Sequence, residues 1–280
     1  MQFATHDISL EQPRVMGILN VTPDSFSDGG QFYRRGRLDT NLACDAAMRM
    51  VESGAIFIDI GGESTRPGAH AVTVQQELDR VLPVVEALAQ QSSCVISVDS
   101  SKPEVFQHAA RAGAGLLNDV RALTEPSALA AAAEVALPVC LMHMQGQPQT
   151  MQDHPRYQDI VEDVCQFLRN RIEACVAAGI DRSRLLVDPG FGFGKTLEHN
   201  LELLNRLGEL RALAVPILVG VSRKSMIGAV LNKPPERRLA GGLALAVLAV
   251  DKGASVIRTH DVEATVDALK MVRAVSQSSE

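Results

Sequence analysis

The sequence contains few features typical of membrane, exported or nucleic-acid-binding proteins. No apolar run approaches the roughly 20 residues that a membrane-spanning helix needs. The first residues, MQFATHDISLEQP, lack the basic and then apolar pattern of a secretory signal. The formal net charge is −6, and the lysines and arginines are scattered rather than clustered. We therefore expect a cytoplasmic protein with no membrane or nucleic-acid partner.

Cysteine usage argues against disulfides and structural zinc. The chain has 5 cysteines, an odd number, and none of them forms a CxxC pair. They are Cys44, Cys94, Cys140, Cys165 and Cys175. We expect buried, reduced thiols, as in cytoplasmic proteins.

What the chain does contain is a repeated alternation of short apolar runs and amphipathic helical patterns. The 280 residues are 46% hydrophobic, which is enough for a large core. The predicted strands are Val15–Leu19, Ile56–Ile60, Val95–Val98, Gly115–Leu117, Val139–Met142, Leu185–Val187, Ile217–Val221 and Val256–Ile257. The predicted helices are Leu38–Ser53, Val74–Gln90, Pro103–Ala112, Ser127–Ala136, Asp159–Ala178, Leu197–Leu213, Arg237–Asp251 and Val262–Val275.

Eight strand–helix units in about 250 residues predict a (β/α)8 barrel, an α/β fold with a single domain. Residues 1–14 are interpreted as a cover over one end, and residues 15–280 as the barrel. An open doubly wound sheet is the alternative. The barrel is favoured because almost every predicted strand ends in polar residues, and the ends of all strands converge only in a closed sheet.

The segment Leu185–Thr196, LLVDPGFGFGKT, shows this pattern most clearly. A short apolar strand ends at Asp188 and is followed by glycines that alternate with phenylalanines. The spacing fits neither a phosphate-binding P-loop, which would need glycine at Pro189, nor a dinucleotide fingerprint, which would need glycine at Lys195. An aspartate in this position is predicted to point into a ligand site.

The strand ends divide into two chemical groups. Asp99, Asn118 and Asp188 offer hydrogen-bond acceptors and an amide, with Lys224 as a nearby cation and Phe193 or Met142 to pack on a ring. A carboxylate can accept two parallel N–H bonds, so this group suits a guanidine-containing heterocycle such as a pterin or guanine.

The second group consists of donors and positive charge. Arg66, Arg258 and His260, together with Asn20, suit an oligophosphate and its metal, because Mg²⁺ takes oxygen ligands and obtains several from substrate phosphates. Each residue alone has an ordinary explanation, and His143 is interpreted as a buried histidine outside direct ligand contact. The functional interpretation depends on these residues lying at the same ends of different strands.

Long motifs spread over the whole chain resemble the dihydropteroate synthase family. They are MGILNVTPDSFSDGG (Met16–Gly30), IGGESTRPGA (Ile60–Ala69), SVDSSKPEV (Ser97–Val105), LNDV (Leu117–Val120), LMHMQG (Leu141–Gly146), DPGFGFGK (Asp188–Lys195), VSRKSMIG (Val221–Gly228) and IRTHDV (Ile257–Val262). The resemblance implies a homodimeric barrel enzyme, a transferase of folate biosynthesis. Such an enzyme joins p-aminobenzoate to (7,8-dihydropterin-6-yl)methyl diphosphate with Mg²⁺, forms 7,8-dihydropteroate and releases pyrophosphate.

The resemblance also implies roles for individual residues. The pterin would be held by Asp99, Asn118, Asp188 and Lys224, in a pocket lined by Met142, Phe193 and Gly220. The diphosphate would be bound by Thr65, Arg66, Arg258 and His260, and Asn20 would ligate Mg²⁺. The p-aminobenzoate site would be bordered by Phe26, Pro67, Lys224 and Ser225. Catalysis is assigned to Asn20, Lys224, Arg258 and His260.

Two positions depart from the family pattern. Ser100 stands where threonine is expected, which preserves the hydroxyl, and the first loop, Gln31–Asp39, is longer and more basic than usual. Sulfonamides imitate p-aminobenzoate in this family. Phe26 and Pro67 are the ordinary residues there, so we expect sulfonamides to inhibit this protein.

Two other functions remain open at this point. A methyltetrahydrofolate-using methyltransferase barrel would also bind a pterin, but it would not need Arg66, Arg258 and His260. A non-catalytic pterin-binding paralogue would be expected to lack some of the diphosphate residues. The sequence retains all of them.

Overall fold

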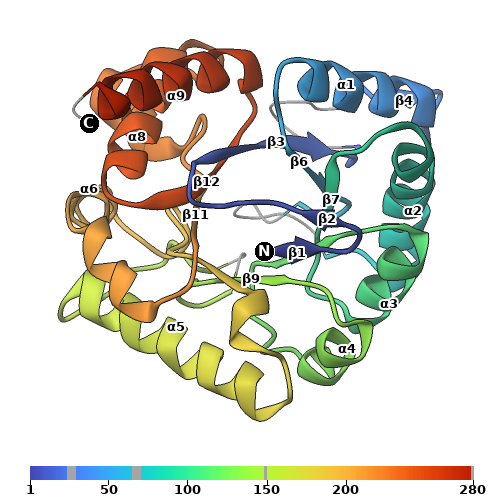
Figure 1. Cartoon of the computed structure of the whole chain (residues 1–280), viewed down its shortest axis with the longest axis horizontal. Coiled ribbons are helices and arrows are strands. Elements are labelled where there is room, and N and C mark those ends of the chain that lie inside the picture. Colours follow the sequence, from blue (N-terminus) through green and yellow to red (C-terminus); the bar gives the residue numbers. More distant parts are fainter. Residues whose placement is uncertain (24–29, 65–70, 148–149, 279–280) are drawn as a thin grey trace.

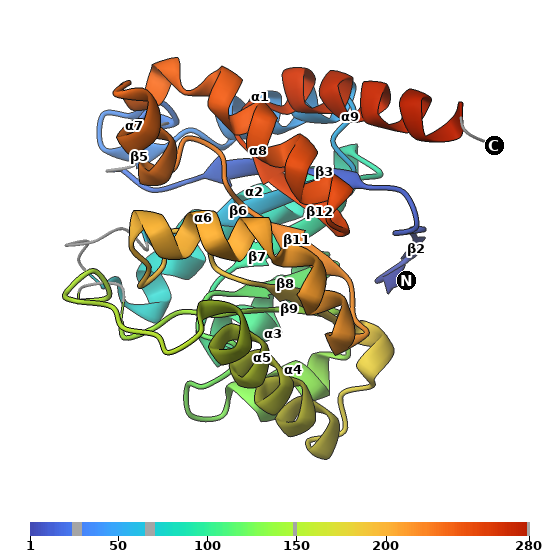
Figure 2. The same ribbon diagram turned by 90° about the vertical axis from the view of Figure 1, so that its left-hand side faces the viewer.

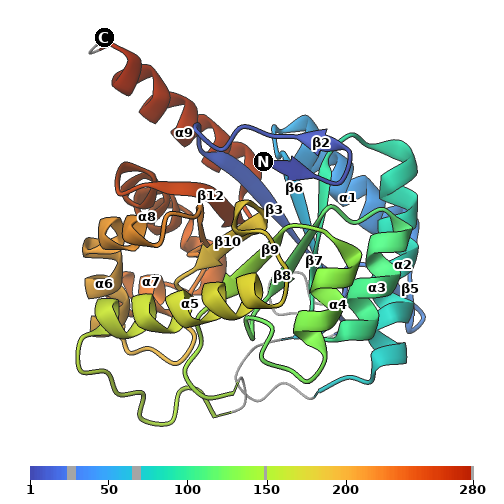
Figure 3. The same ribbon diagram turned by 60° about the horizontal axis from the view of Figure 1, so that its bottom comes forward.

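Eight parallel strands form a closed barrel in the computed structural model, which describes residues 1–23, 30–64, 71–147 and 150–278 (Figures 1 and 3). The order around the barrel is β10-β11-β12-β3-β6-β7-β8-β9. The strands are β3 (Arg14–Asn20), β6 (Phe57–Gly61), β7 (Val95–Asp99), β8 (Leu116–Asp119), β9 (Val139–Met142), β10 (Leu185–Asp188), β11 (Ile217–Val219) and β12 (Ala254–Thr259). The predicted (β/α)8 barrel is confirmed, and the open sheet is excluded.

Helices surround the barrel (Figure 1). They are α1 (Thr40–Glu52), α2 (Val74–Gln91), α3 (Pro103–Ala112), α4 (Ala128–Val135), α5 (Ile160–Ala177), α6 (Leu197–Asn205), α7 (Ser225–Leu231), α8 (Leu239–Asp251) and α9 (Val262–Gln277). Thr73 and Gln76 form a capping box at the start of α2. Pro103 opens α3, where its missing N–H has no helical partner to lose.

Two local predictions were wrong. The helix expected over residues 197–213 ends at Asn205, and a 3-10 helix, Leu207–Leu213, follows; it contains Gly208, which weakens an α-helix. Helix α7 was not predicted, because its 7 residues are too few to show a helical period. Asp261 does not cap α9 with its side chain. Its carboxylate instead forms a charge-assisted ion pair with Arg223, at 2.6 Å.

The barrel interior and the space outside the strands are filled by different residues. Outward residues of the strands pack against the helices in the larger core, and inward residues form a smaller cluster inside the barrel. The inner cluster consists of Phe3, Met16, Phe57, Val95, Leu116, Cys140, Leu186, Leu218 and Val256. These side chains leave no channel at this level, as is usual for such barrels.

A hairpin of β1 (Gln2–Phe3) and β2 (His6–Asp7) covers the N-terminal end of the barrel (Figure 2). Phe3 is fully buried and packs edge-on against Phe57, with 5.0 Å between the ring centroids. The hairpin closes this end of the barrel, and the opposite end, where the strands terminate, is open to a ligand. There, β4 (Tyr33–Arg34) and β5 (Arg37–Leu38) form a second hairpin in the first loop.

All five cysteines are free and buried, as predicted. None of the helices in the described ranges is long and apolar enough to cross a membrane.

Candidate active site

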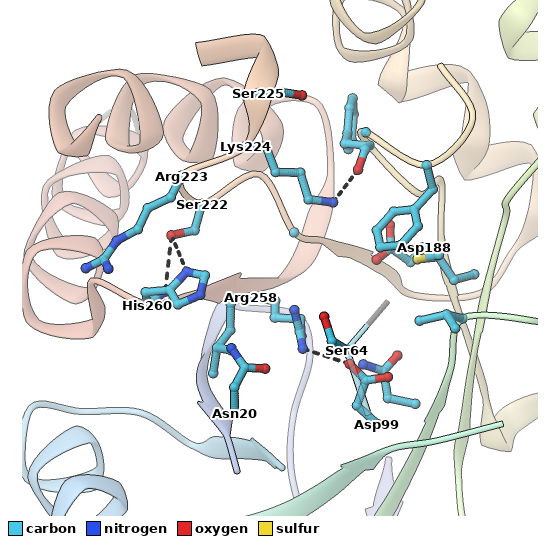
Figure 4. Close-up of a pocket in the computed structure, with 18 of the residues that line it drawn as sticks. Asn20, Ser64, Asp99, Asp188, Ser222, Arg223, Lys224, Ser225, Arg258 and His260 are labelled. Carbon is cyan, nitrogen blue, oxygen red and sulfur yellow. Dashed lines mark hydrogen bonds and ion pairs between the residues drawn. The ribbon is translucent and has the colours of Figure 1, made fainter. Parts of the chain in front are cut away.

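The carboxyl ends of the strands surround a cavity of about 680 Å³ (Figure 4). Every predicted site residue that the structure describes lines it: Asn20, Asp99, Asn118, Met142, Asp188, Phe193, Gly220, Lys224, Ser225, Arg258 and His260. The other four, Phe26, Thr65, Arg66 and Pro67, lie outside the described residues. Residues far apart in the sequence thus meet at one cavity, because a closed barrel brings all strand ends to one rim.

Asp188 anchors one side of the cavity at the end of β10. Its carboxylate is buried and accepts a hydrogen bond from the backbone N–H of Gly190, at 2.7 Å. Burial raises the pKa of Asp188, and the positive charge of Lys224 opposes that shift. The following turn requires glycine, since Gly190 has φ +70° and a Cβ there would come within 1.8 Å of the His143 carbonyl oxygen.

Lys224 extends into the cavity from the start of α7. Its Nζ donates to the carbonyl oxygen of Phe191 and lies 4.6 Å from the ring centroid of Phe193. Burial lowers the pKa of Lys224 to about 8, although Asp188 favours its charged form. Lys224 therefore contacts the glycine-rich turn and also lies within the electrostatic influence of Asp188.

The backbone that carries Lys224 is held by Arg238. One guanidinium nitrogen of Arg238, Nη1, donates to the carbonyl oxygens of Arg223 at 2.9 Å and Lys224 at 3.3 Å. Gly228 leaves room for that guanidinium, because a Cβ at this position would come within 2.0 Å of it. The motif VSRKSMIG thus needs its glycine for a neighbouring arginine and not for a ligand.

Arg258 connects two carboxylates across the floor of the cavity. Its Nε lies 2.6 Å from Asp59 Oδ2, and its Nη2 lies 3.0 Å from Asp99 Oδ2. Burial lowers the pKa of Arg258, but the charges of Asp59 and Asp99 outweigh that effect and raise it overall. The guanidinium is consequently fixed in one orientation at the centre of the site.

Asp59 is a further residue of this site that was not predicted from the sequence. This residue is fully buried, and besides Arg258 it accepts hydrogen bonds from Ser97 Oγ at 2.6 Å and Asn118 Nδ2 at 3.1 Å. Asp59 lies inside an apolar run, so it was read as part of the strand. A charged residue in an otherwise buried parallel strand was the available signal, since such a charge needs a partner.

His260 lies across the cavity from Asp188, beside Arg258 (Figure 4). Its Nδ1 is 3.1 Å from Ser222 Oγ, and its backbone N–H donates to the same oxygen at 3.2 Å. Ser222 lines the cavity as well and had not been singled out. Asn20 comes from the neighbouring strand β3, so that donors and a cation gather on this side.

His143 does not line the cavity, in agreement with its interpretation as a buried histidine. Its Nδ1 lies 2.8 Å from the Nζ of Lys195, which is also buried.

The donor set suits a metal that arrives with its substrate. Within the described ranges, no three or more His, Cys, Asp or Glu side chains form a group that could hold a metal ion. The Asn20 amide lines the cavity together with Arg258 and His260, where an oligophosphate would be attracted. Mg²⁺ binds in this way, with one or two protein oxygens and the rest from phosphates and water.

Asp99 gives the unliganded site a distinctive pH dependence. Burial, reinforced by Asp59, raises the pKa of Asp99 to about 8, although Arg258 opposes the shift. Protonated Asp99 therefore stabilises the folded state fully below a pH of about 4, and this contribution is lost as the pH rises towards 8. The Asp99→Asn variant lacks this titration. We expect its free energy of unfolding, relative to the wild type, to rise by up to about 1.4 kcal/mol per pH unit between about pH 4 and 8.

Chemical denaturation at several pH values measures this difference. The matched control is Asp267→Asn, because Asp267 is exposed and its ion pair is with Lys270 on the same helix. The control replaces an exposed carboxylate instead of a buried one, and the pH-dependent difference is expected for Asp99→Asn alone. A constant difference for Asp99→Asn as well would contradict the raised pKa.

Comparison with known proteins assigns this site to a family. The sequence model described as "Pterin binding enzyme" matches residues 16–260. Dihydropteroate synthase of Escherichia coli (strain K12) is 54% identical over 276 residues, which cover 98% of this chain and 95% of that protein.

Two solved structures are similar over nearly the full length. The Yersinia pestis dihydropteroate synthase with a sulfonamide drug complex has a TM-score of 0.95 at 54% identity, covering 99% of each chain. The Xanthomonas albilineans dihydropteroate synthase in complex with 7,8-dihydropteroate has a TM-score of 0.87 at 47% identity, covering 98% of this chain and 97% of that chain. The chain therefore belongs to the pterin-binding enzyme family and, within it, to the dihydropteroate synthases.

Proposed function

We propose that the cavity at the barrel mouth is the site of the synthase reaction. One end of the cavity binds the heterocycle, and the other end binds the diphosphate. As a dihydropteroate synthase, the chain joins p-aminobenzoate to the methylene carbon of (7,8-dihydropterin-6-yl)methyl diphosphate and releases pyrophosphate. The observation that carries the assignment of ends is that Asp188 lies across the cavity from His260 and Asn20 (Figure 4). Arg258 stands between the two ends, paired with Asp99 at 3.0 Å.

The heterocycle end is formed by Asp188, Asn118, Asp99 and Lys224. Carboxylates match the amidine-like edge of a pterin, which presents two parallel N–H donors. A ring donor bound beside Asp99 would favour its ionised form over the protonated form of the empty site. Met142, Phe193 and Gly220 would line the flat faces of the ring.

The diphosphate end is formed by Arg258 and His260, with Thr65 and Arg66 proposed from the sequence motif. Asn20 would hold Mg²⁺ together with phosphate oxygens. The bound metal would supply charge neutralisation for the departing diphosphate. On this side the chain's own residues bind and orient the leaving group through N–H donors, which is the contribution expected of a fixed guanidinium.

The p-aminobenzoate site is proposed at Lys224 and Ser225, with Phe26 and Pro67 from the first two loops. Loss of pyrophosphate breaks the bond between the methylene carbon and the diphosphate oxygen. The arylamine nitrogen then bonds to that carbon and loses one proton. No strong base is needed, because an arylamine is already neutral at pH 7. Negative charge at Asp188 and Asp99 would stabilise the cationic methylene before attack.

Pyrophosphate release tests the proposed function most directly. We expect release from the pterin diphosphate to need Mg²⁺ and to be stimulated by p-aminobenzoate, with dihydropteroate formed and a sulfonamide competing. Tight pterin binding without any release would indicate a non-catalytic pterin-binding protein instead. Release that is unchanged after chelation of Mg²⁺ would contradict the role of Asn20 as a metal ligand.

A homodimer is proposed through helices α7 and α8, which contact each other. Helix α8, LAGGLALAVLAVD, is strongly apolar, yet only Ala246 and Ala249 are buried. Val230, Leu239 and Leu248 are exposed on these two helices, at 59%, 43% and 46%. An apolar surface of this kind is typical of a protein–protein contact. We also propose a cytoplasmic location, since the five cysteines are buried thiols.

The variant Leu248→Glu is expected to shift the protein from dimer to monomer, because it puts a charge into the proposed contact. Analytical ultracentrifugation measures the change. Val176→Glu on α5 is the matched control, as Val176 is similarly exposed at 47% but lies away from α7 and α8. A dimer that persists in Leu248→Glu would place the contact elsewhere.

A further inference from the structure

A fully enclosed lysine lies directly behind the glycine-rich turn. Lys195 is only 3% exposed, and its Nζ lies 2.9 Å from Gly190 O, 3.1 Å from Phe193 O and 2.8 Å from His143 Nδ1. A buried cation without such partners would be strongly destabilising. Here the three N–H bonds of an ammonium group have three acceptors, so the position is chemically complete.

The hydrogen bond between Lys195 Nζ and His143 Nδ1 forms whether the shared proton sits on the amine or on the imidazole ring. Burial lowers the pKa of Lys195 well below its usual value, and burial together with Lys195 lowers the pKa of His143 to about 2. His143 is therefore neutral. An ammonium group would donate to its Nδ1, whereas a neutral amine would accept from Nδ1–H and still donate to both carbonyls.

The turn curls around this amine. Gly190, Gly192 and Gly194 have φ values of +70°, +79° and +61°, and a Cβ on Gly194 would come within 2.5 Å of Gln145 O. This curvature directs the carbonyl oxygens of Gly190 and Phe193 inward to Lys195. The carbonyl oxygen of Phe191 instead accepts from Lys224 in the cavity.

Other contacts hold the turn from outside. Gly192 N–H donates to Asn200 Oδ1 at 2.7 Å, Gly192 O accepts from Gln152 Nε2 at 2.7 Å, and Gly194 O accepts from Tyr157 Oη at 2.6 Å. None of these groups reaches the carbonyls of Gly190 and Phe193. Their side-chain partner is the Lys195 amine, which occupies the inside of the turn.

We propose that Lys195 is a positioning residue that fixes this turn from inside and, through it, the placement of Phe193 and Lys224 at the heterocycle end. Without the amine, the carbonyls of Gly190 and Phe193 each lose a hydrogen bond, and although Gly190 O still accepts from Phe193 N–H at 3.1 Å, the turn is held less firmly from inside. The Phe193 ring and the Phe191 carbonyl would then leave their positions against Lys224. His143 contributes by supplying the third contact of the amine.

The proposal rests on the assignment of a pterin to this end, and wild-type binding of 6-hydroxymethyl-7,8-dihydropterin tests that assignment separately. The variant Lys195→Met keeps the aliphatic stem and removes the amine. By isothermal titration, we expect at least about tenfold weaker binding of this pterin. Inorganic pyrophosphate with Mg²⁺ should bind within about twofold of wild type, because its proposed donors lie on other strands.

Weaker binding of the pterin with unchanged binding of pyrophosphate distinguishes a positioning role from general destabilisation of the fold. Arg184→Met is the matched control, because Arg184 also donates to two backbone carbonyls, those of Ala132 and Leu137, but at the start of β10. The control should lower the melting temperature and leave both affinities unchanged. Unchanged pterin affinity in Lys195→Met, or an equal loss for both ligands, would overturn the proposal.

A second pair of variants covers the case in which Lys195→Met does not fold. His143→Leu removes one partner of the amine and should weaken pterin binding more than pyrophosphate binding. His143→Gln returns an acceptor and should recover most of that loss. If His143→Leu shows no difference between the two ligands, or if glutamine recovers nothing, the proposal is wrong.

Discussion

Replacing Arg258 by methionine is expected to reduce kcat/KM at least about 100-fold and to lower the free energy of unfolding by about 3–5 kcal/mol. Arg258 is the cation shared by Asp59 and Asp99, at 2.6 and 3.0 Å. Its removal leaves the fully buried Asp59 carboxylate without a counter-charge, beside an Asp99 that is protonated in the empty site. The loss of activity has a separate cause, because the same guanidinium is proposed to bind the departing diphosphate.

The double variant Asp59→Asn/Arg258→Met distinguishes the two effects. Neutralising Asp59 removes the uncompensated buried charge, so we expect much of the stability to return in urea denaturation. Activity should stay low, because the diphosphate donor is still missing. If Arg258→Met alone unfolds like the wild type, or releases pyrophosphate at the wild-type rate, the central role of Arg258 is contradicted.

Replacing Asp188 by alanine is expected to abolish measurable binding of the pterin diphosphate. Loss of a buried carboxylate that accepts charge-assisted hydrogen bonds costs about 2–4 kcal/mol, or roughly 30- to 1,000-fold in affinity. A second loss follows from the structure, because the same carboxylate accepts from Gly190 N–H and helps to shape the adjoining turn. Isothermal titration with the pterin diphosphate measures the combined effect.

Asp188→Asn serves as the comparison for this prediction. Asparagine keeps an oxygen acceptor for Gly190 N–H and removes the negative charge, so it isolates the charge from the turn. We expect it to weaken binding less than alanine does, and both variants to bind pyrophosphate normally. Tight pterin binding by Asp188→Ala would remove the basis for placing the heterocycle at this end.

Patterns in the sequence were sufficient for much of the fold. The eight apolar runs predicted the strands of the barrel, because parallel strands buried on both faces are continuously apolar. Polar residues after those runs predicted a common rim. The 197–213 helix and the missed helix α7 mark the limit of this approach. Short elements and breaks in helices depend on individual tertiary contacts, which the hydrophobic periodicity of a sequence cannot show.

The site was predicted less completely, and Asp59 shows why. Its neighbours in the chain are apolar, and its partners Ser97, Asn118 and Arg258 are 38, 59 and 199 residues away. Lys195 is a similar case, since in the sequence it stands out only as a mismatch to a dinucleotide fingerprint. Its contact with His143 bridges 52 residues.

By itself, the sequence determined the barrel, the strand-end positions of Asp99, Asn118, Asp188 and Arg258, and the resemblance to dihydropteroate synthases. These features depend on local periodicity and on motifs that are continuous in the chain. Only the tertiary structure decided which side chains pair: Arg258 with both Asp59 and Asp99, Lys195 with His143, and Arg238 with the backbone of Lys224. Pairing is set by how strands meet in the closed barrel, and burial then decides which charges need a partner.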